Sequence, residues 1–361
     1  NDKNTTLWGR LPGDIPQEYL QRHSLVPCGV CRKLLSTRFG GVCPRCRPAA
    51  RQATVTQGGA QLSAARVPGL PSLSDVHSRR ATTCKYVPKA ARSLWARCLC
   101  QALAAVVLHN DLSAWTELEM LPKSVLSPAP RGGKHNKHAA ERHTKGLCTR
   151  WLSGERAPLW AQSREQRGGQ KKTANDPEFV LSRCMELAAE GQLQKACATL
   201  VSEPPVEVSR DVVRDMRSKH PLARARPDLS ALGFFHPAQA SQFEGSLVSS
   251  MIRDFPRGSA GGPSGLRPEH LKNALGSAAH ADEVVRQLTL VCNMLARGQA
   301  PAEVSEAVAG ALLTALPKKD GGLRPIAVGE VYRRLVSKCF STTHKNAARA
   351  RLHPFQVGVA V

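Results

Sequence analysis

Near its end the chain reads Leu316-Pro317-Lys318-Lys319-Asp320-Gly321-Gly322-Leu323-Arg324-Pro325-Ile326-Ala327-Val328. An Asp-Gly pair between two apolar runs is a strong hairpin signal, because glycine accepts the positive φ that a tight turn needs. The pattern predicts two antiparallel strands, at about 310–317 and 323–328. Proline has no backbone N–H to give to a ladder, so the second strand is expected at a sheet edge.

Three cations surround the predicted turn, Lys318 and Lys319 before it and Arg324 after it. A hairpin tip with this charge can close over a phosphate chain, because ammonium and guanidinium groups bind phosphate oxygens strongly. The same residues also suit an ordinary solvated hairpin. The stretch by itself leaves both interpretations open.

Most of the remaining chain has apolar residues at helical spacing. The clearest amphipathic helix is predicted over 281–297, and another follows the hairpin with Val331, Leu335 and Cys339 on one face. Further helices are predicted at 89–109, 111–120, 176–190, 193–200, 206–220, 238–254 and from 268 onward. The expected fold class is therefore mostly α with a small β-hairpin (α+β).

Composition points to a polyanionic partner. The 361 residues carry 51 Lys and Arg against 28 Asp and Glu, a net charge of +23. Such an excess favours nucleic acid or an anionic membrane surface. No apolar run approaches the roughly 18 residues of a membrane span, and no signal peptide opens the chain. RNA or DNA is the better interpretation. Oligomeric state is not indicated.

Four of the twelve cysteines form a spacing pattern, Cys28-x2-Cys31 and Cys43-x2-Cys46. Two such pairs can supply four thiolates to a structural zinc ion, and four protein ligands leave no open position for catalysis. A redox dithiol and two chance pairs are the alternatives. The other eight cysteines are scattered, which suits buried thiols in a reducing nuclear or cytoplasmic compartment rather than a secreted disulfide scaffold.

Residues 131–172 form a strongly basic stretch, with a net charge of +8 before its three histidines are counted. It could be an arm that lies on phosphates, or a disordered and solvated linker. Both interpretations stay open at this level.

Upstream of the hairpin stands a glycine-rich loop and helix start, Phe255-Pro256-Arg257-Gly258-Ser259-Ala260-Gly261-Gly262-Pro263-Ser264-Gly265-Leu266-Arg267-Pro268-Glu269-His270-Leu271. The loop, the hairpin "KKDGGLRPIAV", the helix "YRRLVSK" and the segment "QVG" follow one another in an order that resembles the N-terminal part of a LINE-type reverse transcriptase, from non-LTR retrotransposons. The resemblance covers roughly residues 240–361.

This resemblance implies roles for particular residues. Arg324, Lys319, Lys318 and Gln356 match positions near the incoming nucleotide. The glycine-rich loop matches an element of the fingers that approaches the nucleic-acid backbone, although it also suits a plain connector. Cations on the loop and the following helices are expected to bind nucleic acid: Arg257, Arg267, Arg333, Arg334 and Lys338.

The carboxylates that hold the two catalytic metal ions of such polymerases are missing from this sequence. They would lie beyond Val361, and no Asp-Asp pair occurs in the chain. We therefore expect no catalytic residues, no polymerase activity, and a need for Mg²⁺ only in a full-length polymerase. The sequence opens on Asn1 rather than Met, which leaves truncation at both ends open.

Together these patterns predict partial polymerase fingers preceded by a zinc-binding module and basic linkers. A different class of function also fits, a zinc-containing nucleic-acid-binding or adaptor protein without enzymatic activity. The expected segments are a disordered lead-in at 1–24, a zinc ribbon or knuckle at 25–48, a flexible linker at 49–88, a helical segment at 89–130, a basic linker at 131–175, a helical region at 176–237, and a partial reverse transcriptase domain at 238–361.

Overall fold

The computed structural model describes residues 69–129, 137–163, 176–201, 206, 208–219, 242–318, 321–352 and 354, together with the backbone of 25–27 and 34–36. These residues are mostly helical and include two antiparallel strand pairs. The predicted α+β class is confirmed at this level.

The chain divides into two compact units, Asn1–Ala65 and Arg66–Val361. In the first unit the strands β1 (Leu25–Pro27) and β2 (Leu34–Ser36) pair antiparallel. The four cysteines predicted to bind zinc lie outside the described residues, so the zinc module stays a prediction.

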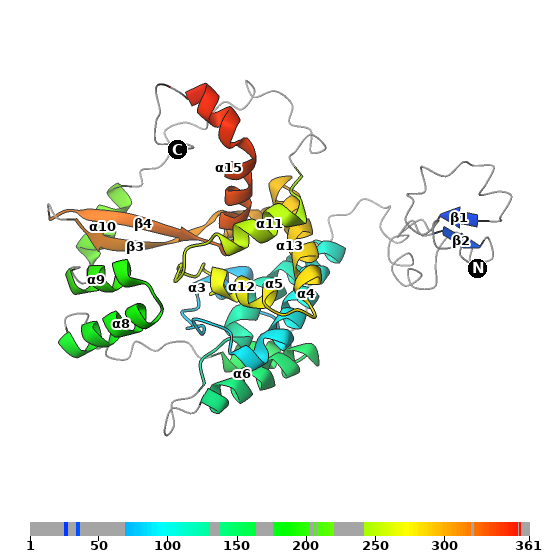
Figure 1. Ribbon diagram of the computed structural model, residues 1–361, viewed down its shortest axis with the longest axis horizontal. Helices are drawn as coiled ribbons and strands as arrows, with labels where there is room; N and C mark the ends of the chain where they lie inside the picture. The colour runs from blue at the N-terminus through cyan, green and yellow to red at the C-terminus, as the bar shows by residue number, and fades with distance from the viewer. Residues whose placement is uncertain are drawn as a thin grey trace. The chain divides into compact units, whose positions relative to one another are not determined.

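Helices make up most of the second unit (Figure 1). Its elements are α3 (Leu73–Ser78), a short 3-10 turn (Lys89–Ala91), α4 (Arg92–His109), α5 (Leu112–Val125), α6 (Lys137–Leu152), α7 (Arg156–Gln162), α8 (Pro177–Ala189), α9 (Leu193–Val201), α10 (Arg210–Ser218), α11 (Gly245–Arg253), α12 (Pro268–Leu275), α13 (Ala281–Ala296), α14 (Ala302–Ala309), β3 (Ala311–Pro317), β4 (Leu323–Gly329) and α15 (Val331–Leu352).

Helix α4 lies at the centre of the hydrophobic core and packs against α5, α6, α12 and α13. Trp95, Leu99 and Leu103 are fully buried, whereas Leu108, near the end of the helix, is 68% exposed. By length and composition alone the helical stretch Lys89–His109 could cross a membrane, contrary to the sequence-based expectation. Its extensive contacts identify it as a core helix of this unit.

Helix α5 shows how packing overrides a local stop signal. The Asp111 side chain accepts a hydrogen bond from the Ala114 N–H at 2.8 Å, as the predicted N-cap requires. The predicted end near Met120 is wrong, because the helix runs through Pro122 to Val125. Proline removes a helical hydrogen bond there, but Val125 is fully buried and its packing favours continuation.

Two stretches predicted as linkers contain helices of the core. Helix α3 lies within 49–88, and α6 and α7 lie within 131–175. Trp151 of α6 is fully buried and Trp160 of α7 is 5% exposed. Burial of such aromatic side chains stabilises helices that local sequence does not favour, so the basic-linker prediction is wrong over 137–163.

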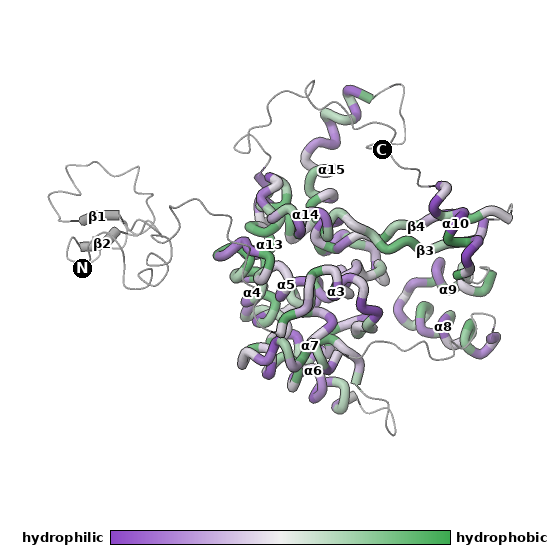
Figure 2. Tube along the Cα trace, turned by 180° about the vertical axis from the view of Figure 1, so that it is seen from behind, coloured by the Kyte–Doolittle hydropathy of each residue, from purple (hydrophilic) through white to green (hydrophobic). Residues whose placement is uncertain are grey.

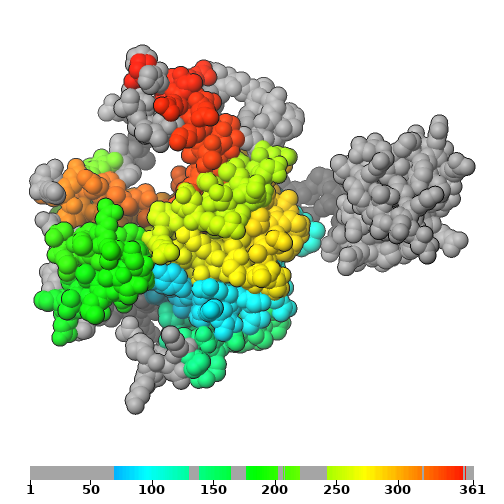
Figure 3. Space-filling model, viewed as in Figure 1, coloured from blue at the N-terminus to red at the C-terminus, as the bar shows by residue number. Residues whose placement is uncertain are grey.

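The helical pair α8–α9 begins as predicted. The Asp176 side chain caps α8, Pro177 is its first residue, and Gly191 takes a φ of +71° in the turn before α9. Figure 3 shows the pair (green) beside the α11–α12 region, where Lys195 donates to the Arg257 carbonyl at 2.7 Å. Helix α10 is shorter than the predicted 206–220.

The C-terminal elements follow their predicted order. Helices α12 and α13 begin where expected, α11 begins at Gly245 rather than 238, and α14 was not predicted. Strands β3 and β4 pair antiparallel close to their predicted bounds, and β4 has no other neighbour among the strands described. Figure 2 colours much of this hairpin hydrophobic, and several β3 leucines are exposed.

Helix α12 is joined to the core by a buried histidine. His270 donates from Nε2 to the Cys84 carbonyl at 2.7 Å, and its Nδ1 accepts from the Arg267 N–H at 3.1 Å. Its carbonyl accepts from the Trp95 indole at 2.9 Å. The neutral tautomer with its proton on Nε2 satisfies both ring nitrogens. A second proton, on Nδ1, would point at the Arg267 N–H, which is also a donor.

Lowering the pH is expected to destabilise the protein through His270. Burial lowers the pKa of this side chain to about 4, from 6.5 when exposed. The unfolded imidazole therefore takes up a proton first, so this contribution is fully present above pH 6.5 and lost as the pH falls toward 4. The full effect is about 3 kcal/mol.

Urea unfolding at several pH values between 7 and 4 measures how steeply the free energy of unfolding falls with pH. The His270→Gln variant should show a shallower dependence over the same range. Equal slopes in the two proteins would show that His270 does not contribute in this way.

Candidate functional site

The glycine-rich loop between α11 and α12 is held in a compact shape by hydrogen bonds within the loop itself. The Gly262 N–H donates to the Leu266 carbonyl at 3.0 Å, and the Gly265 N–H donates to the Gly262 carbonyl at 2.9 Å. Gly265 has a φ of +81°, a conformation that side chains disfavour. These bonds fix a compact turn whose concave side faces the end of β4.

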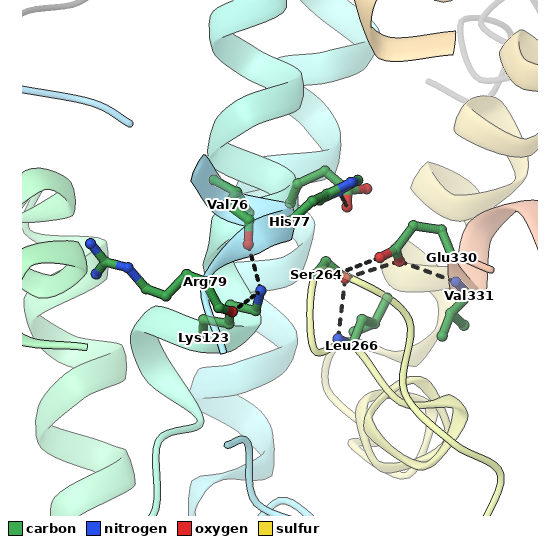
Figure 4. A network of polar contacts seen from close by, with 9 residues as sticks. Val76, His77, Arg79, Lys123, Ser264, Leu266, Glu330 and Val331 are labelled. Atoms are coloured by element: carbon green, nitrogen blue, oxygen red, sulfur yellow. Dashed lines mark hydrogen bonds and ion pairs between the residues drawn. The ribbon is translucent and has the colours of Figure 1, made fainter. Parts of the chain in front are cut away.

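Glu330, between β4 and α15, occupies this concave side. Its carboxylate is fully buried and accepts from the Ser264 N–H, from the Ser264 hydroxyl at 2.9 Å and from the Val331 N–H at 3.2 Å. Figure 4 shows these contacts. A Cβ at Gly262 would lie 2.6 Å from the carboxylate, so glycine is required there. The loop therefore closes around a carboxylate of its own chain.

A second carboxylate lies close to the first. Glu119 of α5 is fully buried and accepts from His77 Nε2 of α3 at 3.0 Å. One ligand atom from each of His77, Glu119 and Glu330 lies within 4.8 Å of the others. Burial raises the pKa of Glu119 to about 8, and burial together with the charge of Glu119 raises the pKa of Glu330 to about 7.

Lys123 lies one turn after Glu119 on α5, yet it does not pair with either carboxylate. Its ammonium group donates to the carbonyls of Val76 and Arg79 (Figure 4). Burial lowers its pKa to about 8, against the raising effect of the two glutamates. We call His77, Glu119, Lys123, Ser264 and Glu330 the Glu330 cluster.

Three cations of α15 that were predicted to bind nucleic acid have partners inside the protein. Arg333 donates to the Ala309 carbonyl and Arg334 to the Ala260 carbonyl, each at 2.6 Å. Lys338 pairs with Asp254 at 2.6 Å and lies 5.4 Å from the centre of the Phe255 ring. These contacts hold α15 against the loop and α11. Nucleic-acid binding by these three side chains stays a prediction.

The two loop cations that were predicted to bind nucleic acid differ in their exposure to solvent. Arg257 is exposed, and its backbone carbonyl accepts a hydrogen bond from Lys195. Arg267 precedes α12, is partly buried, and has an Nε without a partner among the described residues. Arg257 is therefore the more accessible of the two to an anionic ligand.

On the hairpin, Arg324 is exposed and Lys318 is partly buried. Arg324 faces Leu316 across the strand pair, so its side chain shares a face with Leu316 and Leu312, whereas Leu313 lies on the opposite face. Lys319 and Gln356, the other predicted nucleotide-binding residues, lie outside the described residues. The structure therefore presents one predicted nucleotide-binding cation openly, at the hairpin.

No local pattern indicates that His77, Glu119 and Glu330 come together. Glu119 stands in an apolar stretch, at a position where an amphipathic helix would place a core residue. A carboxylate on the buried face was the one available clue. His77 and Glu330 come from distant segments, and only the fold brings them to Glu119.

Comparisons with known proteins do not identify a relative. No protein-family model, curated protein or solved structure matches this chain.

Proposed function

We propose that this protein binds nucleic acid as the fingers part of a LINE-type reverse transcriptase. The observation that carries the proposal is the assembly around Glu330. The glycine-rich loop, the hairpin and the helix after it were singled out separately in the sequence. They form one continuous unit, in which Glu330 bonds to the loop and begins α15.

The exposed charge supports the same function. Arg324 on the hairpin and Arg257 on the loop are accessible cations in a chain with a net charge of +23. Guanidinium groups bind phosphate oxygens in a bidentate manner, and many such contacts give affinity without sequence preference. In a complete enzyme of this type, RNA-directed DNA synthesis would use Mg²⁺ on carboxylates that this sequence does not supply.

The zinc module belongs to the same proposal. Cys28, Cys31, Cys43 and Cys46 would hold one structural zinc ion, and the neighbouring cations would favour nucleic acid as its partner. An adaptor protein with a zinc module but no polymerase ancestry is the competing function, and the position of the nucleic-acid contacts distinguishes the two.

Binding to an oligonucleotide is expected to weaken steeply with salt, because phosphate contacts release counterions. The Arg324→Ala variant should reduce the slope of log affinity against log salt by about one, with similar losses for different sequences. Fluorescence anisotropy at several salt concentrations measures both quantities.

Arg286→Ala provides a matched control. It removes one exposed charge from α13, where Arg286 pairs locally with Glu283 at 2.6 Å. Equal effects of the two variants would show that the hairpin makes no special contact and would favour the adaptor. Affinity that does not depend on salt would contradict phosphate binding altogether.

A further inference from the structure

Three potential metal ligands meet inside the helical unit, and the proposed function uses one of them, Glu330, only for its bonds to the loop. His77 comes from α3, Glu119 from α5, and Glu330 from the junction of β4 and α15. Their nearest ligand atoms lie within 4.8 Å of one another. Because these segments are far apart in sequence, an ion bound here would connect three parts of the fold.

The two carboxylates of this group have no Lys or Arg partner in direct contact among the described residues. Both carboxylates are fully buried, and a buried carboxylate without a counter-charge is strongly unfavourable. The nearby cation, Lys123, directs its ammonium group to the carbonyls of Val76 and Arg79 instead. The pair of glutamates therefore needs either a shared proton or a bound cation.

Two polar atoms beside the group lack hydrogen-bond partners among the described residues. One is Oε1 of Glu119, whose other oxygen contacts His77, and the second is the hydroxyl of Tyr332, which is 1% exposed. Tyr332 follows Glu330 by two residues, in the first turn of α15. Unpartnered atoms of this kind are expected where a ligand completes a site.

We propose that His77, Glu119 and Glu330 bind a divalent transition-metal ion of the zinc type. One imidazole nitrogen with two carboxylate oxygens suits such an ion, whereas Mg²⁺ prefers oxygen ligands alone. Three protein ligands leave a fourth position for water. The His77 side chain is 15% exposed and gives the ion a route from solvent.

The ion would act as a structural link. Glu330 already bonds to Ser264, so metal binding would connect the glycine-rich loop to α3 and α5. This inference does not depend on nucleic-acid binding. The site also differs in chemistry from the predicted four-cysteine module, which allows the two to be measured separately.

The test uses the full chain with Cys28, Cys31, Cys43 and Cys46 changed to serine, so that thiolate zinc is removed. Elemental analysis after addition of Zn²⁺ and gel filtration should find about one ion per chain. Co²⁺ in its place should give weak d–d bands without thiolate charge transfer. The thermal midpoint should rise with Zn²⁺, because binding to the folded state stabilises it.

Glu119→Gln in this background should lose the ion and the zinc-dependent rise in midpoint. Glu117→Gln is the matched control, because it removes the same charge two residues earlier, where Glu117 pairs with Arg156 at 3.1 Å. His77→Ala, at a partly exposed ligand, provides a second variant with the same expected loss should Glu119→Gln not fold.

Two results would overturn the proposal. One is a parent chain that retains no zinc. The other is zinc that persists equally in the His77→Ala and Glu119→Gln variants. A Glu119→Gln protein that is more stable than its parent, with no response of either to Zn²⁺, would instead identify a shared proton between the glutamates.

Discussion

Replacing Gly262 with alanine is expected to lower the free energy of unfolding by about 2–3 kcal/mol. The new Cβ would lie 2.6–2.7 Å from all three atoms of the Glu330 carboxylate. This carboxylate is buried and bonded to Ser264 and Val331, so it cannot move aside without losing those bonds. Urea denaturation of the variant and the parent measures the difference.

Gly146→Ala is the appropriate control for this change. Gly146 lies in α6, and nothing stands within 4 Å of the Cβ that alanine would add. The higher helix propensity of alanine should make this variant equal to the parent or more stable by up to about 1 kcal/mol. If Gly262→Ala behaved in the same way, the close approach of the loop to Glu330 would be wrong.

Replacing Trp95 with alanine is expected to lower the free energy of unfolding by about 3–5 kcal/mol. The indole is fully buried in α4, and its Nε1 donates to the His270 carbonyl at 2.9 Å. The substitution leaves a large cavity between α4 and α12 and removes that bond. Thermal unfolding followed by circular dichroism should show a lower midpoint.

Leu108→Ala on the same helix tests whether burial is the cause. Leu108 is 68% exposed, and substitutions at exposed positions usually change stability by less than about 0.5 kcal/mol. Comparable losses of unfolding free energy in the Leu108→Ala and Trp95→Ala variants would contradict the position of α4 at the centre of the core.

Local signals predicted the elements that depend on local chemistry. The Asp-Gly turn placed β3 and β4, Asp176 with Pro177 placed the start of α8, and Pro268 placed the start of α12. In each case a cap or turn residue determines the backbone directly. Such signals need no knowledge of the tertiary structure.

The errors arose where packing outweighs local preference. Basic and polar residues over 131–175 suggested a linker, yet Trp151 and Trp160 bury enough surface to hold α6 and α7. Pro122 suggested a helix end, yet the buried residues after it keep α5 helical. Neither outcome can be derived from composition, because both depend on contacts with distant segments.

The candidate site also combines features that local sequence indicates with features that depend on packing. The sequence identified the glycine-rich loop and the hairpin as important, and the resemblance left the loop either as an element that approaches nucleic acid or as a plain connector. The loop instead surrounds Glu330, whose only distinction in the sequence is its position between a strand and a helix. His77 and Glu119 join it only through the packing of α3 and α5.

A double-mutant cycle between Gly262→Ala and Glu330→Ala tests most directly whether the loop is built around the Glu330 carboxylate. If it is, Gly262→Ala should cost less than about 0.5 kcal/mol once Glu330 is alanine, because the group that it would strike has been removed. The coupling energy from urea unfolding should then be about 1.5–3 kcal/mol. Losses that simply add in the double variant would contradict the contact, and with it the assembly of loop, hairpin and helix into one unit.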